Sequence, residues 1–437
     1  MQLYSTKNPD LRVDFGQAIL NALPKDNGLY MPTEIPKLGD DFIKNIRKMS
    51  FQEMSYEIAK TIIGDSIPAD ILKEIVYDAI NFPAEVVHIH DNIYSLELFH
   101  GPTLAFKDFG ARFMSRVMKY FKKKGKKLYI LVATSGDTGG AVASGFYKVD
   151  GIEIVILFPK GKVSPLQQKQ LTTLGENITA VEIDGTFDDC QAIVKKAFLD
   201  EEMSENYDLS SANSINISRL IPQSFYYFNA LKQVDYNENV SFVVPSGNFG
   251  NITAGILGQK MGLPVKHFIA ATNANDVVPE YIATGEYRPR PATATISNAM
   301  DVGDPSNFPR LSDLYGSTWN TIKDKLKGYA YSDEQTKETI LEVYKDYGYL
   351  LDPHGAIGYL AAMEYKYETG YEEPIIFLET AHPSKFKETV EETLNQEIEI
   401  PERLSILSEK QEHFYPLPNK YEKFKKWFKS TFEETEN

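Results

Sequence analysis

The chain has 437 residues, and its 46 Lys and Arg residues against 61 Asp and Glu residues give a formal net charge of −15 at neutral pH. Hydrophobic residues at 42% and charged residues at 24% are typical of folded proteins and argue against a disordered chain. The acidic balance argues against binding to nucleic acid, because proteins that bind it present a basic face to the phosphate backbone.

The cysteine count and the first residues indicate the compartment. Cys190 is the only cysteine, which excludes an intramolecular disulfide and a cysteine-based zinc site. Asp10, Arg12 and Asp14 lie near the start, where a secretory signal would carry an apolar segment. No run approaches the ~18 consecutive apolar residues of a membrane-spanning helix. We therefore expect a cytoplasmic protein with no membrane partner.

The predicted elements begin with helices and continue with alternating strands and helices. Residues 1–84 contain short amphipathic segments interrupted by prolines, which predicts a mainly helical N-terminal region. Apolar runs then predict buried strands at residues 128–133, 154–158, 240–244 and 375–378. Their alternation with helical segments indicates an α/β fold with a largely parallel sheet covered on both faces. Ligands bind at the carboxyl ends of such strands, and three of these four strands end in unusual polar turns.

Three helix signals in the second half of the chain have structural explanations. Ser332 and Gln335 form a capping-box pattern, and Asp352 before Pro353 is typical of a cap followed by proline at the first helical position. Near the C-terminus, four aromatic residues share one helical face: Phe424, Trp427, Phe428 and Phe432. We expect this face to dock on the protein itself rather than on a partner.

Lys107 is the first candidate for chemistry. It lies between Phe106 and Phe109, where a helical spacing of apolar residues begins. An ammonium group held against apolar side chains loses hydration, which favours the neutral, nucleophilic amine. Such an amine condenses with an aldehyde, so Lys107 could carry pyridoxal phosphate as a Schiff base. The alternative from these residues alone is a solvated surface lysine beside Asp108.

The segment Ser246-Gly-Asn-Phe-Gly-Asn251 lies between a predicted strand and a predicted helix. Its two glycines permit a tight bend and a close approach to an anion, and the helix N-terminus supplies unpaired N–H groups. A phosphate cradle and a plain strand-to-helix turn both agree with this pattern. The segment lacks the Walker lysine and the dinucleotide-binding glycine spacing, which disfavours NTP and NAD.

A second turn, Ser135-Gly-Asp-Thr-Gly139, also leads from a strand into a helix. Its backbone N–H groups and the hydroxyls of Ser135 and Thr138 suit a substrate carboxylate, whereas Asp137 suits a group that donates a proton. Thr380 follows another strand, where its hydroxyl could bond a ring nitrogen. The seven histidines show no metal-ligand spacing, so we predict no metal site, with His382 as a possible lining residue.

Together these motifs resemble the threonine synthase family, in the branch of its enterobacterial and fungal members. The resemblance covers essentially the whole chain in order. It rests on the segments 28–32, 98–114, 134–139, 210–219, 244–251, 297–302 and 380–386. Motifs of this length in this order do not match by chance.

The resemblance implies fold type II of the pyridoxal-phosphate enzymes, the tryptophan-synthase-β-like fold. Two α/β lobes of open parallel sheets then hold the cofactor between them. We expect an N-terminal region in residues 1–84 and a smaller lobe in 85–230, with Lys107 and the Ser135–Gly139 turn. The larger lobe would then comprise 231–437. A monomer and a homodimer both remain open.

The resemblance also implies residue roles toward the cofactor pyridoxal 5′-phosphate. Lys107 would carry it, Thr380 would lie by the pyridine nitrogen, and Asp137 would face the phenolic oxygen. Many relatives in other branches have asparagine at the position of Asp137. The cofactor phosphate would be cradled by Gly247, Asn248, Phe249, Gly250 and Asn251.

The implied reaction converts O-phospho-L-homoserine and water to L-threonine and phosphate. Ser135 and Thr138 are candidates for the substrate carboxylate. Asn216 and Arg219 are candidates for the substrate phosphate, ahead of Arg112 and Lys162, with structural ion pairing as the alternative. Two other functions remain open: another fold-type-II enzyme, such as a hydroxy-amino-acid dehydratase or a related phospholyase, and a catalytically silent pyridoxal-phosphate-binding protein.

Overall fold

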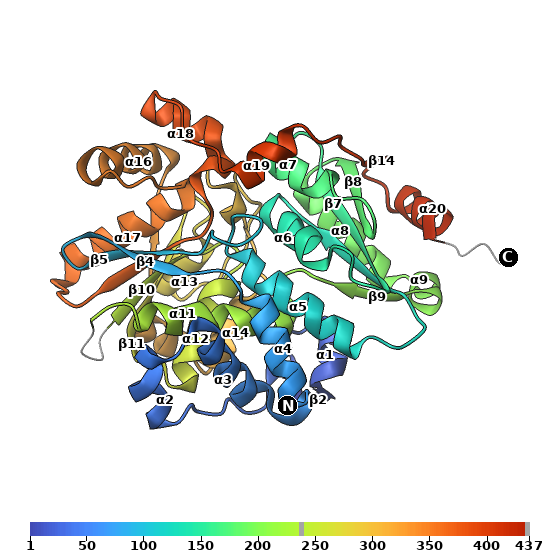
Figure 1. Cartoon of the computed structure of the whole chain (residues 1–437), viewed down its shortest axis with the longest axis horizontal. Helices are drawn as coiled ribbons and strands as arrows, with labels where there is room; N and C mark the ends of the chain where they lie inside the picture. The colour runs from blue at the N-terminus through green and yellow to red at the C-terminus, as the bar shows by residue number, and fades with distance from the viewer. Residues whose placement is uncertain (236–239, 433–437) are drawn as a thin grey trace.

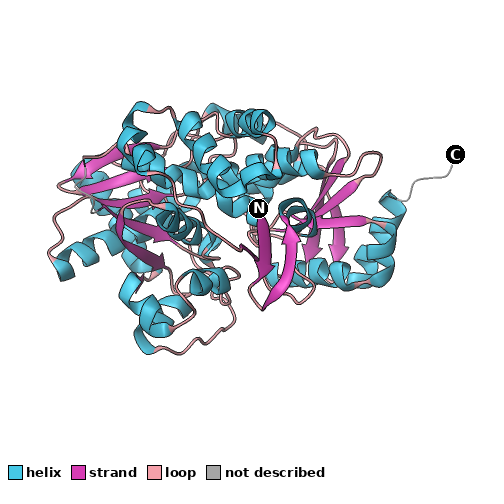
Figure 2. Ribbon diagram, turned by 90° about the horizontal axis from the view of Figure 1, so that it is seen from below, coloured by secondary structure: helices cyan, strands magenta, loops and turns pink. Residues whose placement is uncertain are grey.

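A computed structural model describes residues 1–235 and 240–432 of the chain; residues 236–239 and 433–437 lie outside the description. Two large sheets lie toward opposite ends of the molecule, with helices between and around them (Figures 1 and 2). The N-terminal helices run along the lower side of the view in Figure 1. These elements form an α/β fold, which confirms the predicted class.

The N-terminal region contains a small sheet that the sequence did not predict. Its antiparallel strands have the order β2-β1-β3. The strands are β1 (Gln2–Ser5), β2 (Asn8–Asp14) and β3 (Tyr30–Pro32). The helices that follow or separate them are α1 (Phe15–Asn21), α2 (Asp40–Asn45), α3 (Phe51–Ile63) and α4 (Ala69–Ala79). The prediction of a mainly helical region therefore missed the strands, of which β1 and β3 are short and β2 is largely exposed.

The larger sheet has six strands in the order β12-β11-β10-β13-β5-β4. All neighbours are parallel except β4, which runs antiparallel to β5. The strands are β4 (Glu85–His90), β5 (Ile93–Glu97), β10 (Val240–Pro245), β11 (Val265–Thr272), β12 (Leu326–Ala330) and β13 (Ile375–Glu379). The predicted strands at 240–244 and 375–378 are confirmed.

The second large sheet has five parallel strands in the order β14-β8-β7-β6-β9. The strands are β6 (Leu128–Ala133), β7 (Ile152–Pro159), β8 (Ile178–Asp184), β9 (Asp208–Ser211) and β14 (Tyr415–Pro418). The predicted strand at 128–133 is confirmed, and the one predicted at 154–158 extends further in both directions.

Helices cover both large sheets, as the alternating pattern predicted. Those of the first half are α5 (Lys107–Phe121), α6 (Asp137–Phe146), α7 (Pro165–Thr172), α8 (Phe187–Leu199), α9 (Glu201–Asn206), α10 (Ile217–Leu220) and α11 (Phe225–Leu231). Those of the second half are α12 (Gly250–Met261), α13 (Val277–Thr284), α14 (Phe308–Leu314), α15 (Trp319–Lys325), α16 (Asp333–Tyr347), α17 (Pro353–Thr369), α18 (Lys387–Leu394), α19 (Glu402–Ser408) and α20 (Tyr421–Phe432). The capping box predicted before α16 and the Asp352 cap of α17 are both present.

The sheets do not follow the predicted lobe boundaries. β4 and β5 belong by sequence to the range 85–230, yet β5 pairs with β13 in the six-stranded sheet. In the same way, β14 comes from the range 231–437 and pairs with β8 in the five-stranded sheet. The chain therefore crosses between the lobes more often than three consecutive segments allow.

The C-terminal helix docks on the five-stranded lobe, as its aromatic face predicted. Phe424 and Phe428 of α20 are fully buried in a cluster with residues of α8 and of the sheet. The Phe428 ring lies 5.5 Å from the ring of Tyr129 on β6. None of the helices within the described residues is both long and apolar enough to cross a membrane.

We expect Phe428→Ala to lower the free energy of unfolding of this lobe by about 3 kcal/mol, because the deletion leaves a cavity in a packed cluster. Urea titration followed by circular dichroism measures the change. Tyr367→Ala removes a side chain that is 91% exposed and should change it by less than about 0.5 kcal/mol. Equal losses in the two variants would contradict the docking of α20.

Candidate active site

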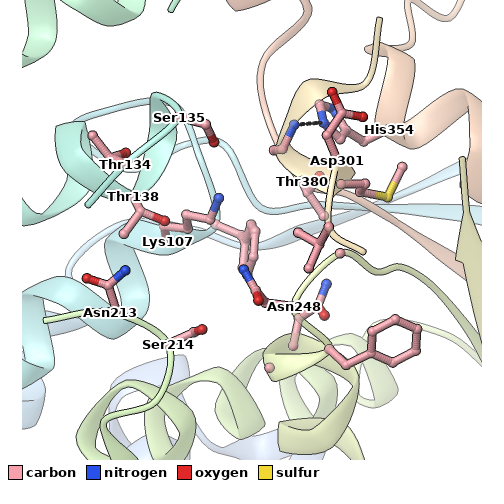
Figure 3. A pocket seen from close by; sticks show the side chains of 18 of the residues that line it. Lys107, Thr134, Ser135, Thr138, Asn213, Ser214, Asn248, Asp301, His354 and Thr380 are labelled. Atoms are coloured by element: carbon pink, nitrogen blue, oxygen red, sulfur yellow. Dashed lines mark hydrogen bonds between the residues drawn. The ribbon is translucent and has the colours of Figure 1, made fainter. Parts of the chain in front are cut away.

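One cavity lies where the carboxyl ends of strands from both large sheets meet. β6 and β10 end on residues that line it, and Thr380, the residue after β13, lines it as well. The space measures about 850 Å³, including its opening to solvent. Figure 3 shows Lys107 in the middle of this cavity, with Ser135 and Thr138 on one side and Thr380 and His354 on the other. The strand ends therefore bring together side chains that are far apart in the sequence.

Lys107 is held in place by the loop that precedes it. It is the first residue of α5. The Phe106 N–H donates to the Thr380 carbonyl at 2.9 Å, so the loop is tied to the end of β13. Asp108, which the alternative interpretation placed beside a solvated lysine, is fully buried and accepts from both the backbone and the hydroxyl of Thr103. Because these contacts occupy Asp108, its carboxylate does not pair with Lys107.

The Lys107 amine has the desolvated environment that its aromatic neighbours predicted. Burial, together with the charges of Arg219 and Lys385, lowers its pKa from 10.5 to about 8 against the opposing effect of Asp137. The amine lies 5.6 Å from the centre of the Phe106 ring. A far larger fraction of the amine is therefore neutral near pH 7 than for an ordinary lysine.

Asp137 is paired with a lysine that the sequence analysis did not single out. Its Oδ1 lies 2.5 Å from Lys385 Nζ and accepts from Gln167 Nε2 at 2.7 Å. All three side chains are buried. Although burial opposes ionisation, Lys385 and Lys107 hold the pKa of Asp137 well below its usual range. Asp137 is thus an ionised carboxylate that balances the positive charge of Lys385 near Lys107.

The segment 246–251 has the geometry of an anion cradle. It joins β10 to α12, with Phe249 in the left-handed conformation at φ 60°. For the backbone N–H groups of residues 247–251, no partner is found within residues 1–235 and 240–432. These N–H groups lie at and just before the N-terminus of α12, where unpaired donors and the helix dipole favour an anion. A Cβ on Gly247 would lie 2.8 Å from the carbonyl oxygen of Ala299, which explains the need for glycine there.

The two asparagine side chains of this segment hold the loop itself. Asn251 Nδ2 donates to the Pro245 carbonyl at 2.7 Å, across the bend. Asn248 Oδ1 accepts from the Ser306 hydroxyl at 2.9 Å. The predicted cradle residues are therefore together at the cavity, where the backbone N–H groups of the loop are left for a ligand and the Asn251 amide is not.

Of the candidates for substrate binding, Ser135, Thr138 and Arg219 line the cavity and Asn216 does not. Asn216 is fully buried, and its amide donates to the carbonyls of Ile19 and Ser211 while capping α10. This contradicts its expected position beside the substrate.

Asn213 and Ser214, three and two residues earlier, lie at the cavity instead (Figure 3). The sequence analysis quoted the motif that contains them, but spacing alone did not show which of its polar residues point inward. Arg219 donates through Nη1 to the Ala212 carbonyl at 2.7 Å, and its buried Nε has no partner in the described chain. Burial lowers its pKa to about 10, so it keeps its charge at neutral pH.

The other two candidate cations lie elsewhere. Arg112 donates to the carbonyls of Asp78 and Ala79, outside the cavity. Lys162 lines a neighbouring hollow that shares Ser135 with the cavity.

His354 is a cavity residue that the sequence analysis missed. It follows the capping residue Asp352, whose Oδ1 lies 2.5 Å from His354 Nδ1. On its other side, Nε2 accepts from the Ala299 N–H at 3.3 Å, the contact drawn in Figure 3. His382, the predicted lining residue, instead caps the short helix Pro383–Phe386 through its Nδ1. The sequence Asp352-Pro-His indicated a helix cap, but no local pattern indicated that His354 lines the cavity.

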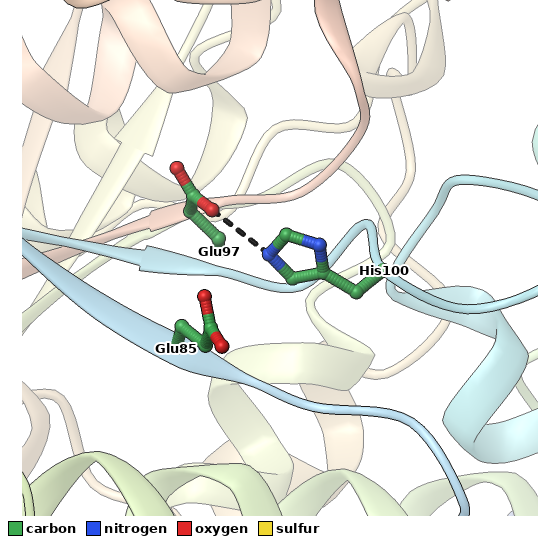
Figure 4. Close-up of side chains that lie close together, drawn as sticks. All are labelled: Glu85, Glu97 and His100. Atoms are coloured by element: carbon green, nitrogen blue, oxygen red, sulfur yellow. Dashed lines mark hydrogen bonds and ion pairs between the residues drawn. The ribbon is translucent and has the colours of Figure 1, made fainter. Parts of the chain in front are cut away.

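One cluster within the described residues has the spacing of metal ligands: Glu85, Glu97 and His100 (Figure 4). Glu97 accepts from His100 Nε2 at 2.8 Å and from the Tyr349 hydroxyl at 2.9 Å. Glu85 is exposed at the edge strand β4. Through these two contacts, Glu97 joins β5 to the loop that follows it, which carries His100, and to the segment between α16 and α17, which carries Tyr349.

Three family models match the chain. A model described as pyridoxal-phosphate dependent enzyme matches residues 84–380, one described as threonine synthase N terminus matches 2–80, and one described as threonine synthase, C-terminal, matches 355–427.

Similar proteins extend over nearly the whole chain. Threonine synthase of Serratia marcescens is 45% identical, with 98% of this chain and 99% of the relative covered. The crystal structure of threonine synthase from Escherichia coli has a TM-score of 0.93 at 44% identity, covering 99% of this chain and 100% of the other. The pyridoxal-phosphate-bound threonine synthase from Brucella melitensis has a TM-score of 0.92 at 36% identity, covering 98% and 99%.

The fold and the cavity define a pyridoxal-phosphate-dependent enzyme of fold type II. Within that class, the chain belongs to the threonine synthase family. The family, fold and cofactor that the motifs implied are thereby confirmed.

The Lys107 pKa gives a prediction about reactivity in cofactor-free protein. With a pKa of about 8, about one tenth of the amine is neutral at pH 7, and the neutral fraction nears its maximum above pH 9. Competitive labelling with acetic anhydride, read by peptide mass spectrometry, should therefore rise about tenfold from pH 7 to pH 9 and then level off. A lysine in a model peptide is the control, with a labelling rate that still rises above pH 10. The same continued rise at Lys107 would show that its amine is solvated.

Proposed function

We propose that the protein converts O-phospho-L-homoserine and water to L-threonine and phosphate, with Lys107 as the catalytic residue. The observation that carries this proposal is the desolvated Lys107 amine, which shares one cavity with the unpartnered N–H groups of residues 247–251 and the buried cation Arg219. We further propose that the protein acts in the cytoplasm, as a monomer or a homodimer. Light scattering distinguishes the two assemblies.

The residues present suit pyridoxal phosphate at the cavity. Its phosphate is expected at the unpartnered N–H groups of residues 247–251, and its aldehyde at the Lys107 amine. Thr380, which lines the cavity, is proposed to bond the ring nitrogen with its hydroxyl. When bound, the cofactor supplies an electron sink for negative charge that develops on the substrate carbons.

Asp137 is proposed to act near the phenolic oxygen through its pair with Lys385 rather than alone. The carboxylate already accepts from Lys385 and Gln167, so the pair presents both a donor cation and an acceptor anion. Asparagine at this position would be neutral and would leave Lys385 without a counterion. Aspartate at residue 137 therefore supplies the negative charge that a buried lysine at residue 385 needs.

Lys107 is proposed to move the protons of the reaction. When free, its neutral amine would take the proton from Cα and then a proton from Cβ, and would serve as the acid at the later carbons. With the Cβ proton removed, the bond between Cγ and the phosphate oxygen breaks, and the phosphate leaves with the electron pair. Water then adds its oxygen at Cβ, and protons return to Cγ and Cα, which gives threonine.

The substrate is proposed to bind through both of its anionic groups. Ser135 and Thr138, on the turn that begins α6, offer hydroxyls to the carboxylate. Arg219, with Asn213 and Ser214 beside it, offers a buried cation and amide or hydroxyl groups to the phosphate. Hydrogen bonds to a charged group in a partly desolvated site are stronger than neutral ones, so these contacts orient the substrate toward Lys107.

Loss of the amine should remove both cofactor attachment and turnover. Lys107→Ala is expected to lack the visible absorbance of the covalently held cofactor and nearly all production of threonine. The assay supplies O-phospho-L-homoserine and measures phosphate and threonine together. Wild-type turnover in the variant would contradict the mechanism. Ketoacid without threonine from the wild-type enzyme would favour a dehydratase or a related phospholyase, and no product at all would favour a silent binding protein.

Shortening the proposed substrate cation should raise KM. Lysine cannot reproduce the guanidinium fork, so Arg219→Lys is expected to raise KM for O-phospho-L-homoserine about tenfold, equivalent to about 1.4 kcal/mol. Arg112→Lys is the matched control, because Arg112 bonds main-chain carbonyls outside the cavity. Equal KM values in the two variants would remove Arg219 from substrate binding.

A further inference from the structure

The Nδ2 group of a buried asparagine beside the cradle has no hydrogen-bond partner among the described residues. Asn307 directly precedes α14 and is fully buried, and its Nδ2 is unpaired within the part of the chain that the structure describes. A Cβ built on Gly250 would lie 3.4 Å from this Nδ2 and 3.8 Å from Ser214 Cβ. Gly250 and Ser214 both line the cavity. An unpaired buried donor destabilises a folded protein, so its presence indicates a ligand that accepts the hydrogen bond.

Arg310 determines which end of the Asn307 amide faces the cradle. Its Nη1 donates to Asn307 Oδ1 at 2.9 Å. A guanidinium group has donors only, so the atom that faces it must be the amide oxygen. The NH₂ group therefore points toward the side where Gly250 lies.

Arg310 is itself a buried cation with no anionic partner. It is fully buried, and its other hydrogen bonds go to the main-chain carbonyls of Tyr30, Ser214 and Ile215. Among the described residues, no carboxylate lies within ion-pair distance of it. Burial lowers its pKa to about 9, so it is still charged at neutral pH. A buried charge of this kind is costly, and an anion bound nearby would offset the cost.

A main-chain hydrogen bond fixes the position of Asn307 relative to the cradle loop 246–251. The Asn307 N–H donates to the Asn248 carbonyl at 3.1 Å. The neighbouring Ser306 bonds the Asn248 side chain through its hydroxyl at 2.9 Å. The start of α14 and the loop 246–251 are therefore joined as one unit, and Asn307 keeps its position relative to the backbone N–H groups.

We propose that Asn307 donates a hydrogen bond from Nδ2 to the phosphate group held in the cradle, and that Arg310 is a positioning residue that orients this amide. The ligand class is a phosphate monoester, and the proposal, which rests on the proposed function, assigns that phosphate to the cofactor. The assignment follows from the contacts of Asn307 with the loop that carries the unpartnered N–H groups.

Asn307→Asp tests the proposal, since it keeps an oxygen toward Arg310 while it removes the donor and adds a negative charge. The cofactor-free variant should bind pyridoxal phosphate at least about tenfold more weakly, as expected for a lost charge-assisted hydrogen bond. Its thermal midpoint without cofactor should not fall, because the new carboxylate pairs with Arg310. Asn229→Asp is the control: this buried amide donates to the Ala84 carbonyl at 2.7 Å, so the midpoint should fall and cofactor affinity should stay unchanged.

A second ligand separates this proposal from the role of Lys107. Pyridoxal lacks the phosphate, so Asn307→Asp should bind it as the wild type does, whereas a failure at Lys107 would impair both ligands. Unchanged affinity for pyridoxal phosphate would overturn the proposal. So would a higher KM for O-phospho-L-homoserine with unchanged cofactor affinity, since the donor would then serve the substrate phosphate. If Asn307→Asp does not fold, Asn307→Ala should show the same selective loss.

Discussion

Removal of the Lys107 amine from water is the constraint on which the rest of the site depends. An amine keeps its neutral form near pH 7 only where water is displaced and the surrounding charges do not favour the ammonium. The loop before α5 provides the first condition, through its ties to Thr380 and Asp108. Arg219 and Lys385 contribute to the second, since both lower the pKa of the amine and so oppose Asp137, which raises it. Arg219 places a buried positive charge at the cavity of a chain whose net charge is −15.

This local positive charge suits a reaction with phosphate groups on both cofactor and substrate. Arg219 lies at the cavity, and Arg310 lies behind it, joined through Asn307 to the cradle loop. Of these three cations, only Lys385 has a counterion among residues 1–235 and 240–432, the Asp137 carboxylate. Buried cations without partners destabilise an empty protein, so binding of the anions should contribute to the stability of the loaded form. Function and stability are thereby coupled through the same side chains.

The sequence predicted the parts of the fold that depend on local pattern. Buried parallel strands are continuous apolar runs, so β6 and β10 were found within a residue of their observed ends. The three-stranded N-terminal sheet was missed because β1 and β3 are short and β2 is largely exposed. The pairing of β5 with β13 joins residues more than 250 positions apart, and no local pattern indicates it.

The site shows the same division. Lys107 and the loop 246–251 could be found because a lysine between aromatic residues and a paired-glycine turn are local signals. Asn216 was misplaced because the amide of Asn213, not its own, points to the cavity. Lys385 and Asn307 could not be found, since their roles depend on Asp137 and Gly250, which the fold brings to them.

The attachment point of the cofactor is the most direct test of the account. Borohydride reduction of the loaded enzyme fixes the cofactor to the amine that holds it, and peptide mapping then identifies that residue. The account predicts the label on Lys107. A label on Lys385, the other buried lysine beside Asp137, or on no lysine at all would contradict it.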